Sequence, residues 1–504
     1  MLFRSPWGLG TWGNGQSNLV SIRLWSQNNF GQDLVFGPRG GGMYYWTADD
    51  GVTTRAVNLN SLGGTVGISN ASPTVITLTT VLANGTPVKF ASTGTLPTGI
   101  SASTTYCLEN VAANLNCNIS TSPGGSLVNT SSAGSGTFSI ATLVDVPIYQ
   151  NYMVVSDVSR FVIAFGCNDY GSVIQDPMLV RWSDQEDALN WTPTATNQAG
   201  SLRLSHGSQI VTAIQNRQEI VVITDSSVYN MQYLGPPYVW NAQLLADNIS
   251  IVGQNSWATA SGVIYWMGVD KFYKYDGRVQ TLRCDLRQHI FNNINANQNQ
   301  QIFGCTNEGF NEIWWFYCSA GSTVIDSYVI YNYFEDIWCY GTMGRTAWID
   351  SGLRPYPVAA TYSNNLVSHE SGVDNNETAV TQAINAYISS SEFDIDDGHN
   401  FGFIWRILPD ITFRGSQGGN TPQATMYLIP MNSSGSGYTT PASVGGLDNG
   451  AVTRIATVPI EEFTGYVYIR VRGRQLIFKV ESNQIGTTWQ LGSPRIDIRP
   501  DGRR

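Results

Sequence analysis

The chain has 504 residues, of which 42% are hydrophobic and 12% aromatic, so it carries enough apolar material for a large folded core. Charged residues make up only 13%, about half of the roughly 25% typical of globular proteins, which excludes a disordered chain and a long coiled coil. The net charge of −10 disfavours a general nucleic-acid-binding protein, because such proteins usually carry a basic excess.

Near the N-terminus, three short strands are predicted over residues 20–25, 33–36 and 43–46. These runs are rich in β-branched and aromatic residues, and Gly, Asn and Gln separate them, which favours tight turns. The pattern predicts a small antiparallel meander.

The segment 63–143 differs sharply in composition from the rest of the chain. It contains none of the 15 Trp residues and only two charged side chains, Lys89 and Glu109. Short β-branched runs alternate in it with Thr, Ser and Gly, which is typical of strands and turns. We therefore expect 63–143 to be a separate small β module inserted into a larger body.

After this segment, the chain reads as repeated meanders of three or four short strands. One meander is predicted at 210–233, another at 257–275 and a third at 301–340. Corresponding strands begin about 45 residues apart, at Glu219, Val263, Glu312 and Pro357. A period of this length with four strands in each unit is typical of a β-propeller, and the predicted strands suggest about six blades.

The residues after 376 break this rhythm with longer alternating runs. Such runs extend over 386–393, 403–413, 424–429, 466–474 and 475–480. Alternation of apolar and polar residues predicts strands with one buried and one exposed face, as in a β-sandwich.

These patterns together predict an all-β protein in which a β-propeller of about six blades carries an inserted small β module and a C-terminal β-sandwich-like domain. The predicted boundaries are 1–62 for the first propeller blade or blades, 63–143 for the inserted module, 144–375 for the remaining blades and 376–504 for the sandwich-like domain.

The sequence lacks the familiar motifs of catalysis and nucleotide binding, namely GxSxG, Walker A and a strand–GxGxxG–helix pattern. The four His residues form no HExxH pair, so a zinc site is not predicted. The acidic run at 394–398 begins like a calcium loop, but Trp405 stands where such a loop needs Glu. The Gly-rich run at 38–42 favours a tight turn over an anion-binding nest. We expect no catalytic residue, no cofactor and no metal, and a protein that is not an enzyme.

The C-terminal region holds a group of arginines that are candidate contact residues: Arg470, Arg472, Arg474, Arg499, Arg503 and Arg504. The first three alternate along the chain, so a strand would present them on one face. Such a positive stripe could contact DNA phosphates in a channel, or it could form salt bridges between subunits of an otherwise acidic protein. The sequence leaves both alternatives open.

Four segments resemble motifs of tail proteins from short-tailed bacteriophages: RLWSQNNFGQDLVFGPRGGGMYYW at 23–46, RWSDQEDALNW at 181–191, RGRQ at 472–475 and GSPRIDIRPDGRR at 492–504. The group is the tail nozzle proteins, which comprise tail tubular protein B-like proteins and the related packaged-DNA stabilisation proteins. The inserted module resembles small β modules of phage tail proteins through LPTGISASTTY at 96–106 and SPGG at 122–125.

The resemblance implies a β-propeller-containing subunit of a homohexameric ring below the head–tail adaptor, or connector. Such a ring retains the packaged DNA and forms the channel for its ejection. The resemblance further implies contacts with tail fibre or spike proteins and transient contact with viral double-stranded DNA. Because the first motif begins at residue 23, an upstream adaptor-facing part is expected to be short or absent.

Three features of the sequence are compatible with a virion tail protein that assembles in the host cytoplasm. No apolar run approaches about 18 residues, so no membrane span is predicted. The N-terminal residues lack the apolar core of a secretory signal. The seven Cys residues are scattered without a CxxC pair, which favours free thiols.

An alternative function is that of a propeller-type glycan-binding or glycan-cleaving protein acting on the host surface. The segment 482–489 has the frame of a sialidase Asp box, but Gln484 stands where Asp belongs. An enzyme of this kind would gather carboxylates at one end of the propeller. A nozzle subunit would instead associate with six-fold symmetry.

Overall fold

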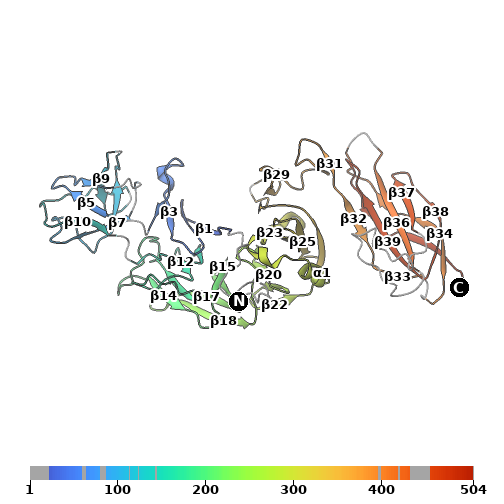
Figure 1. The fold of residues 1–504 in the computed structure, drawn as a ribbon, viewed down its shortest axis with the longest axis horizontal. Helices are drawn as coiled ribbons and strands as arrows, with labels where there is room; N and C mark the ends of the chain where they lie inside the picture. Colours follow the sequence, from blue (N-terminus) through green and yellow to red (C-terminus); the bar gives the residue numbers. More distant parts are fainter. Residues whose placement is uncertain are drawn as a thin grey trace, which may run out of the picture. The chain divides into compact units, whose positions relative to one another are not determined.

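The computed structural model describes residues 22–59, 64–79, 84, 87–112, 114–122, 124–141, 145–352, 354–395, 399–417, 421–431 and 455–502. The chain divides into two compact units, Met1–Ser351 and Gly352–Arg504. Strands make up most of the regular structure in both units (Figure 1). In the described ranges, the helical elements are α1 (Arg287–Asn292) and the 3-10 turns η1 (Ala48–Asp50), η2 (Ala296–Gln301) and η3 (Glu308–Phe310).

The described part of the first unit contains five antiparallel sheets of four strands each, with the strands ordered as in the chain. We call these sheets blades 1 to 5. Blade 1 has β1 (Trp25–Phe30), β2 (Asp33–Pro38), β3 (Tyr44–Trp46) and β4 (Val57–Asn58); blade 2 has β11 (Tyr152–Val155), β12 (Val162–Phe165), β13 (Leu179–Trp182) and β14 (Gly200–Arg203); blade 3 has β15 (Ile210–Asn216), β16 (Glu219–Thr224), β17 (Ser227–Gly235) and β18 (Val239–Asp247).

Blade 4 has β19 (Trp257–Ala260), β20 (Val263–Met267), β21 (Phe272–Tyr275) and β22 (Val279–Leu282); blade 5 has β23 (Phe303–Asn307), β24 (Glu312–Tyr317), β25 (Ser327–Asn332) and β26 (Ile337–Thr342). A sixth sheet follows with three strands, β27 (Ala347–Ile349), β28 (Val358–Ala360) and β29 (Leu366–Ser368). The division between the compact units falls just after β27.

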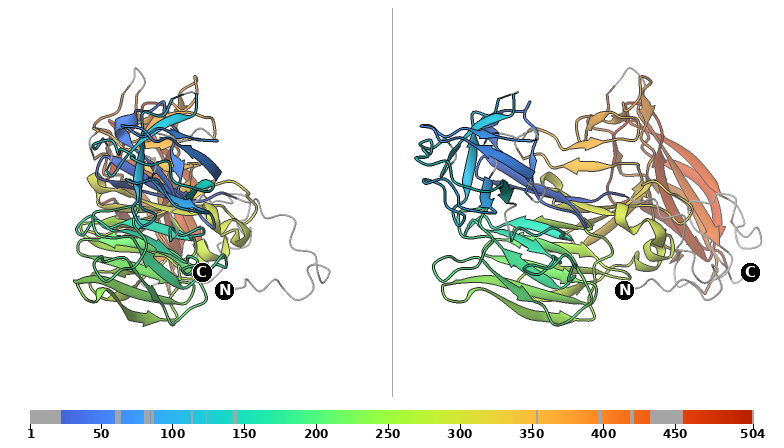
Figure 2. Two further views of the ribbon diagram at one scale, coloured as in Figure 1. Left: turned by 90° about the vertical axis from the view of Figure 1, so that its left-hand side faces the viewer. Right: turned by 60° about the vertical axis from the view of Figure 1, so that its left-hand side comes forward.

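Consecutive blades pack face to face, and their first strands lie against one another, as β1 does with β11 and β19 with β23. Figure 2 shows the small sheets following one another in chain order. Each seam has its own apolar cluster: Val35 and Val162 lie between blades 1 and 2, Phe165 and Ile220 between 2 and 3, Ile223 and Trp266 between 3 and 4, Phe272 and Trp315 between 4 and 5, and Trp314 and Trp348 between blade 5 and β27. Repetition of four-stranded sheets with packed faces is the architecture of a β-propeller.

The sequences of the central strands follow from this packing. A blade that is covered on both faces buries successive residues rather than alternate ones. β16 (EIVVIT) and β24 (EIWWFY) each bury five residues in a row. The last strand of a blade is more exposed, and β26 is accordingly only partly buried or exposed along its whole length.

Blades 2 and 5 carry closely similar loops between their second and third strands. The loop of blade 2 reads GSVIQD at 171–176, and the loop of blade 5 reads GSTVID at 321–326. In both, a Ser hydroxyl accepts a hydrogen bond from the backbone N–H two residues later, at 3.1 Å for Ser172 and 3.2 Å for Ser322. The shared sequence and geometry indicate that the two blades are copies of one structural repeat.

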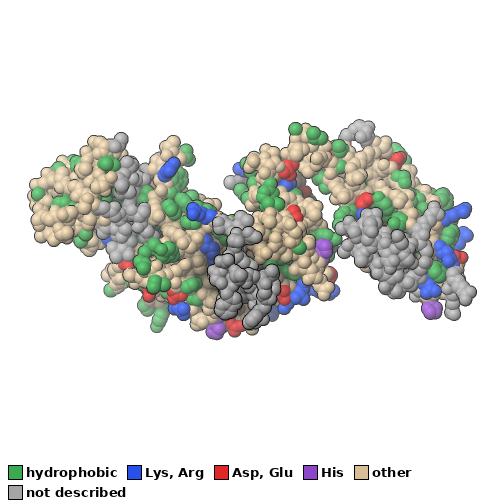
Figure 3. Space-filling view, viewed as in Figure 1, with side chains coloured by type: hydrophobic (Ala, Val, Ile, Leu, Met, Phe, Trp, Pro, Cys, Tyr) green, Lys and Arg blue, Asp and Glu red, His purple; other side chains and the backbone are tan. Residues whose placement is uncertain are grey.

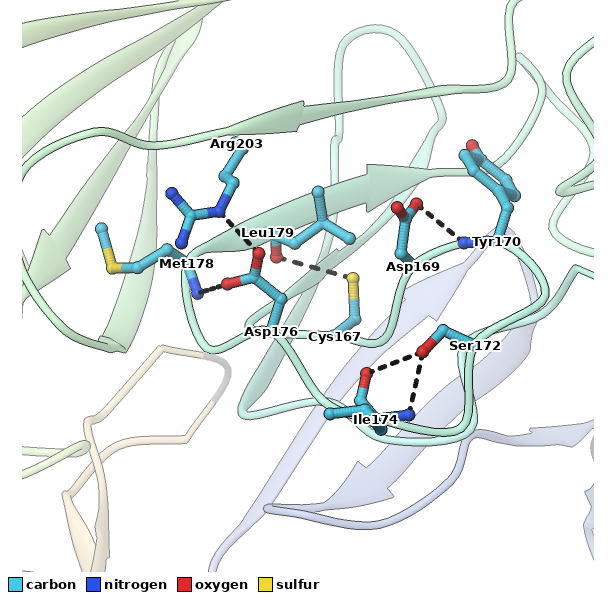
Figure 4. Close-up of polar contacts among 9 residues, drawn as sticks. All are labelled: Cys167, Asp169, Tyr170, Ser172, Ile174, Asp176, Met178, Leu179 and Arg203. Carbon is cyan, nitrogen blue, oxygen red and sulfur yellow. Dashed lines mark hydrogen bonds and ion pairs between the residues drawn. The ribbon is translucent and has the colours of Figure 1, made fainter.

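Each of these loops is closed by its last Asp residue. In blade 2, Asp176 accepts a hydrogen bond from the backbone N–H of Met178 at 3.0 Å and pairs with Arg203 at 2.6 Å (Figure 4). In blade 5, Asp326 accepts from the backbone N–H and the hydroxyl of Ser319, at 2.9 and 2.7 Å. The loops are therefore held by local polar contacts, whereas apolar seams hold the blades.

Between blade 1 and blade 2 the chain forms a closed β-barrel with the strand order β10-β5-β6-β9-β8-β7. The strands are β5 (Gly64–Ile68), β6 (Ile76–Thr77), β7 (Pro87–Ser92), β8 (Tyr106–Glu109), β9 (Asn116–Ser120) and β10 (Phe138–Ala141). Its core includes Phe90, Leu108 and Ile119, all less than 2% exposed. All six strands lie inside the segment 63–143 that composition had set apart.

The second unit has a two-layered core. One layer is a sheet of β32 (Ala386–Ser389), β39 (Gln475–Ser482), β36 (Gln423–Met431) and β37 (Ala456–Glu461), with β33 (Phe393–Asp394) also paired to β39; the other is a sheet of β38 (Val467–Gly473), β34 (Gly402–Leu408) and β41 (Arg495–Pro500). Apolar residues of both sheets, among them Ile404 and Val471 from one and Met426 and Leu476 from the other, form a single cluster. This is the packing of a β-sandwich.

The short pairs β30 (Asp374–Asn375) with β31 (Gln382–Ala383) and β35 (Ile411–Thr412) with β40 (Gln490–Leu491) complete the unit. The predicted run 403–413 is broken into β34 and β35. Pro409 has no backbone N–H for a ladder, and Asp410 adopts a positive φ of 49°, so the strand cannot continue through them. The predicted run 386–393 is likewise divided between β32 and β33.

The predicted all-β fold class, with propeller blades, an inserted small β module and a C-terminal β-sandwich, is confirmed. Five four-stranded blades and the three-stranded sheet lie in the described ranges. The division between compact units falls at 351/352, upstream of the predicted domain boundary at 375/376.

Candidate functional site

The sheet β38-β34-β41 buries one face in the sandwich core and exposes the other. Figure 3 shows Lys and Arg side chains gathered over these strands in the C-terminal unit. We call the exposed side the Arg–aromatic face. It consists of Phe401, Phe403, Trp405, Arg406, Tyr466, Tyr468, Arg470, Arg472, Arg495, Asp497, Arg499 and Asp501.

Cross-strand register brings these residues together from distant parts of the chain. Phe403 of β34 lies opposite Arg472 of β38 on one side and Arg499 of β41 on the other. Since paired residues in a sheet share a face, the three side chains form one row. A second row contains Tyr468, Arg406 and Asp497 in the same strand order.

An irregularity in β34 adds a further side chain to the face. The pairing register shifts between Ile404 and Arg406 on both sides of the strand. A bulge of this kind turns two successive side chains toward the same side of a sheet. Trp405 and Arg406 both make ring contacts on the exposed face as a result.

The guanidinium groups of the face lie over aromatic rings. The Cζ atom of Arg472 is 4.2 Å from the ring centre of Phe401, and that of Arg474 is 4.9 Å from the same ring. Arg406 and Arg499 each lie 4.8 Å from the ring centre of Trp405. Stacking of this kind restricts the orientations of the guanidinium groups.

Two of the arginines are paired with aspartates inside the face. Arg406 donates to Asp497, and Arg472 donates to Asp501. The hydrogen bond to Asp497 raises the pKa of Arg406 above its usual value. With five arginines and two aspartates, the face has a formal charge of +3. Its two tyrosines are open to solvent, with Tyr466 58% and Tyr468 70% exposed.

This arrangement is suited to recognising carboxylates and phosphates. A guanidinium donates two parallel N–H bonds to a carboxylate or phosphate, which a Lys ammonium cannot do. Because guanidiniums cover Trp405 and Phe401, these rings are poorly placed to stack on a sugar. The face therefore offers oriented positive charge beside exposed tyrosine rings.

The structure brings four of the six predicted arginines together. Arg470, Arg472 and Arg499 lie on the Arg–aromatic face. Arg474 lies just beyond the end of β38, is half-buried, and contacts the ring of Phe401. Arg503 and Arg504 lie outside the described residues.

Residues that the sequence reasoning missed are Arg406 and the aromatic side chains of the face. The sequence indicates the aromatic residues in part. Phe403 and Trp405 are two positions apart in β34, and Tyr466 and Tyr468 are two positions apart around the start of β38. Alternation alone did not indicate that β34 and β41 lie beside β38.

Other candidate sites proved to be structural. In the Gly-rich run 38–42, the backbone N–H groups of Arg39, Gly40 and Gly41 already donate to carbonyl oxygens, so they form a tight turn and not an anion nest. Among the described residues, no group of His, Cys, Asp and Glu is arranged to hold a metal ion. In the same residues, no helix has the length and apolarity needed to cross a bilayer. Residues 396–398 of the acidic run lie outside the described ranges.

Two arginines of the segments 23–46 and 181–191 lie inside the propeller unit. Nη1 of Arg39 donates to the carbonyl of Asn151 at 3.3 Å, the carbonyl of Val211 at 2.9 Å and the side-chain oxygen of Gln254 at 3.2 Å. Arg39 thus links blade 1 to residues at the starts of blades 2, 3 and 4. Burial lowers the pKa of its guanidinium to about 10.

Arg181 is only 1% exposed and is held inside blade 2. It donates to the backbone carbonyls of Asn168, at 2.9 Å, and Asp145, and its guanidinium lies 3.8 Å from the ring centre of Tyr170. Trp191, at the end of the same motif, is 1% exposed and packs in the seam between blades 1 and 2. Arg181 therefore stabilises blade 2 internally, whereas Trp191 helps to hold blades 1 and 2 together.

Comparison with known proteins gives no family. No family model matches the chain, and no curated protein matches it. Among solved structures, the CNH domain of AfRom2 matches with 9% identity and a TM-score of 0.27, covering 68% of this chain and 90% of that one.

Two further solved structures are similar at the same level. PorZ, a surface component of the type-IX secretion system of Porphyromonas gingivalis, matches with 12% identity and a TM-score of 0.26, covering 71% of this chain and 50% of that one. The phage phi92 endosialidase matches with 10% identity and a TM-score of 0.24, covering 78% of this chain and 71% of that one.

Proposed function

We propose that the chain is a structural, non-catalytic subunit of the tail nozzle of a short-tailed bacteriophage. In this role six copies form a ring below the head–tail adaptor, retain the packaged DNA and form the channel through which it is ejected. The subunit assembles in the host cytoplasm, becomes part of the virion tail, and contacts tail fibres or spikes.

The observation that carries the proposal is the place of the two phage-like motifs in the fold. The segment 23–46 forms the first three strands of blade 1, and 181–191 forms the end of β13 and the loop after it in blade 2. The barrel, which itself resembles small phage-tail modules, lies between these blades in the chain. Arg39 and Arg181, one from each motif, bind backbone carbonyls across or within the blades.

Charge gives further support to a role around DNA. The propeller-containing unit has 15 basic and 23 acidic residues, so it is strongly acidic. An acidic wall repels the DNA backbone, which lets a duplex slide without being held. Arginines at a few places along the channel would give local grip.

The test is electron microscopy of the purified chain, alone and mixed with the head–tail adaptor of the same phage. Six-fold rings with a central opening, formed alone or on the adaptor, are the expected result. Compact monomers or trimers that do not bind the adaptor would overturn the proposal and favour the glycan-directed alternative. Oligosaccharide binding and cleavage assays would then follow.

A further inference from the structure

The Arg–aromatic face has the composition of a protein interface. Arg, Tyr, Trp and Phe are the residues enriched in such interfaces, and Lys is depleted in them. The face has five arginines, five aromatic rings and no lysine. A surface that only follows a DNA backbone gains nothing from the two aspartates, Asp497 and Asp501, that alternate with Arg499 along β41.

Blade 5 provides a surface of opposite charge. No Lys or Arg occurs from residue 288 to residue 344, which includes the whole of this blade. The loop between β23 and β24 presents Glu308 and Phe310, and the loop between β25 and β26 presents Phe334, Glu335 and Asp336. We call these five residues the blade 5 rim.

The two loops of the blade 5 rim are tied to each other. The side-chain N–H of Asn332 donates to the carbonyl of Phe310 at 3.1 Å, and the backbone N–H of Tyr333 donates to the carbonyl of Asn311 at 3.0 Å. Phe310 is nevertheless 52% exposed and Phe334 80% exposed. Large exposed rings on a well-held loop pair, beside three carboxylates, are typical of a contact surface.

We propose that the Arg–aromatic face of one copy docks on the blade 5 rim of a second copy of this chain. The formal charge of +3 on the face meets −3 on the rim. The guanidiniums of Arg470 and Arg499, which have no aspartate partner within the face, donate to rim carboxylates. The exposed tyrosines of the face pack on Phe310 and Phe334.

Such a contact joins two different surfaces, so a pair of copies keeps a free rim on the first copy and a free face on the second, and each of these can bind a further copy. A heterologous contact of this kind builds a closed ring when its rotation divides a full turn, and an open filament when it does not. The inference rests on the proposed function for the number of copies in the ring. The contact itself does not require that function.

The test uses charge reversal in the full chain. Arg470→Glu with Arg499→Glu reverses the face, and Glu308→Arg with Glu335→Arg reverses the rim. Each pair should weaken self-association about 100-fold, measured by mass photometry and sedimentation velocity over a range of concentrations. A chain carrying all four changes should associate again, because the signs match once more.

Matched controls separate this contact from a general charge effect. Arg414→Glu and Asp157→Arg are exposed single reversals outside the two surfaces, and both should leave association unchanged. Far-ultraviolet circular dichroism and a thermal melt of each variant establish that the fold is kept.

Three results would overturn the inference. Rings that persist in both double variants would show that another surface joins the copies. A change of shape at constant single-chain mass would show that face and rim meet within one chain. Loss of salt-sensitive binding to duplex DNA, with association intact, would assign the face to DNA. A different result is that rings form, are lost and restored by the charge reversals as expected, and yet fail to bind the adaptor. That result would refute the nozzle function and support the contact between copies.

Discussion

The propeller unit and the C-terminal sandwich use the same side chain in opposite ways. In the propeller, Arg39 and Arg181 are turned inward, and their terminal N–H groups donate to backbone carbonyl oxygens. In the sandwich, Arg472 and Arg499 are turned outward and lie on aromatic rings. An inward Arg supports the fold, whereas an outward Arg presents its charge at the surface. The difference lies in what surrounds the guanidinium.

The largest loss of stability is expected when Arg181, a buried arginine of the propeller unit, is replaced. Arg181→Met leaves the carbonyls of Asn168 and Asp145 without their donors and removes the cation from beneath Tyr170. We expect a loss of about 3 kcal/mol in the free energy of unfolding, measured by urea denaturation. The exposed Arg160→Met serves as the control. Equal midpoints for the two variants would contradict the structural role of Arg181.

A smaller loss is expected when the inward charge is kept but its geometry is changed. Arg39→Lys preserves the cation, but the Lys side chain is one bond shorter, so its ammonium falls short of the position from which Nη1 of Arg39 reaches acceptors at the starts of three blades. The expected cost is about 1–2 kcal/mol, read from the same denaturation curves. Arg55→Lys, at an exposed position, should change nothing. A fully stable Arg39→Lys protein would show that charge alone suffices there.

Acid should reduce the stability that the hydrogen-bonded carboxylate of Asp326 provides. Burial alone would raise the pKa of Asp326, but hydrogen bonds from Ser319 and Ser327 outweigh it and lower that pKa below the usual 3.8. Its contribution to stability is therefore present above about pH 4 and lost as the pH falls through the lowered value. Asp326→Asn should weaken the dependence of stability on pH below about pH 4, measured by thermal melts in a pH series. An unchanged slope would count against this assignment.

The smallest effect on stability is expected for an exposed arginine of the Arg–aromatic face. Arg470→Ala removes an exposed side chain on the Arg–aromatic face and should change the free energy of unfolding by no more than about 0.5 kcal/mol. Chemical denaturation at low protein concentration, where copies are separate, gives the clean comparison. A loss as large as that of Arg181→Met would mean that the face supports the fold and is not held ready for a partner.

The strands of the blades could be predicted because their signal is local. A central strand such as β20, Val263–Met267, is an apolar run that ends at Gly and Asp, and its bounds are those expected from the sequence. The fully buried runs of β16 and β24 follow from coverage on both faces. The similar loops at 171–176 and 321–326 offered a further signal of repetition, which the strand spacing alone did not use.

The Arg–aromatic face could be predicted only in part, because it depends on pairing between distant strands. The alternation of Arg470 and Arg472 indicates one exposed face, but it does not indicate which strands lie beside it. β34 and β41 are more than 60 residues apart in the chain, with β38 between them. The bulge that turns Trp405 outward likewise depends on both neighbours of β34.

The inserted barrel has a consequence for how blades 1 and 2 find each other during synthesis. These blades share a seam, and Gly41 forms a bridge with Gln150, although more than 100 residues separate them. A flexible linker of that length would carry the entropy cost of closing a long loop. A barrel that closes on itself acts instead as a short tether, because its own folding brings its two ends to fixed positions. The stability of the insert is thus coupled to the speed at which the first seam of the propeller closes.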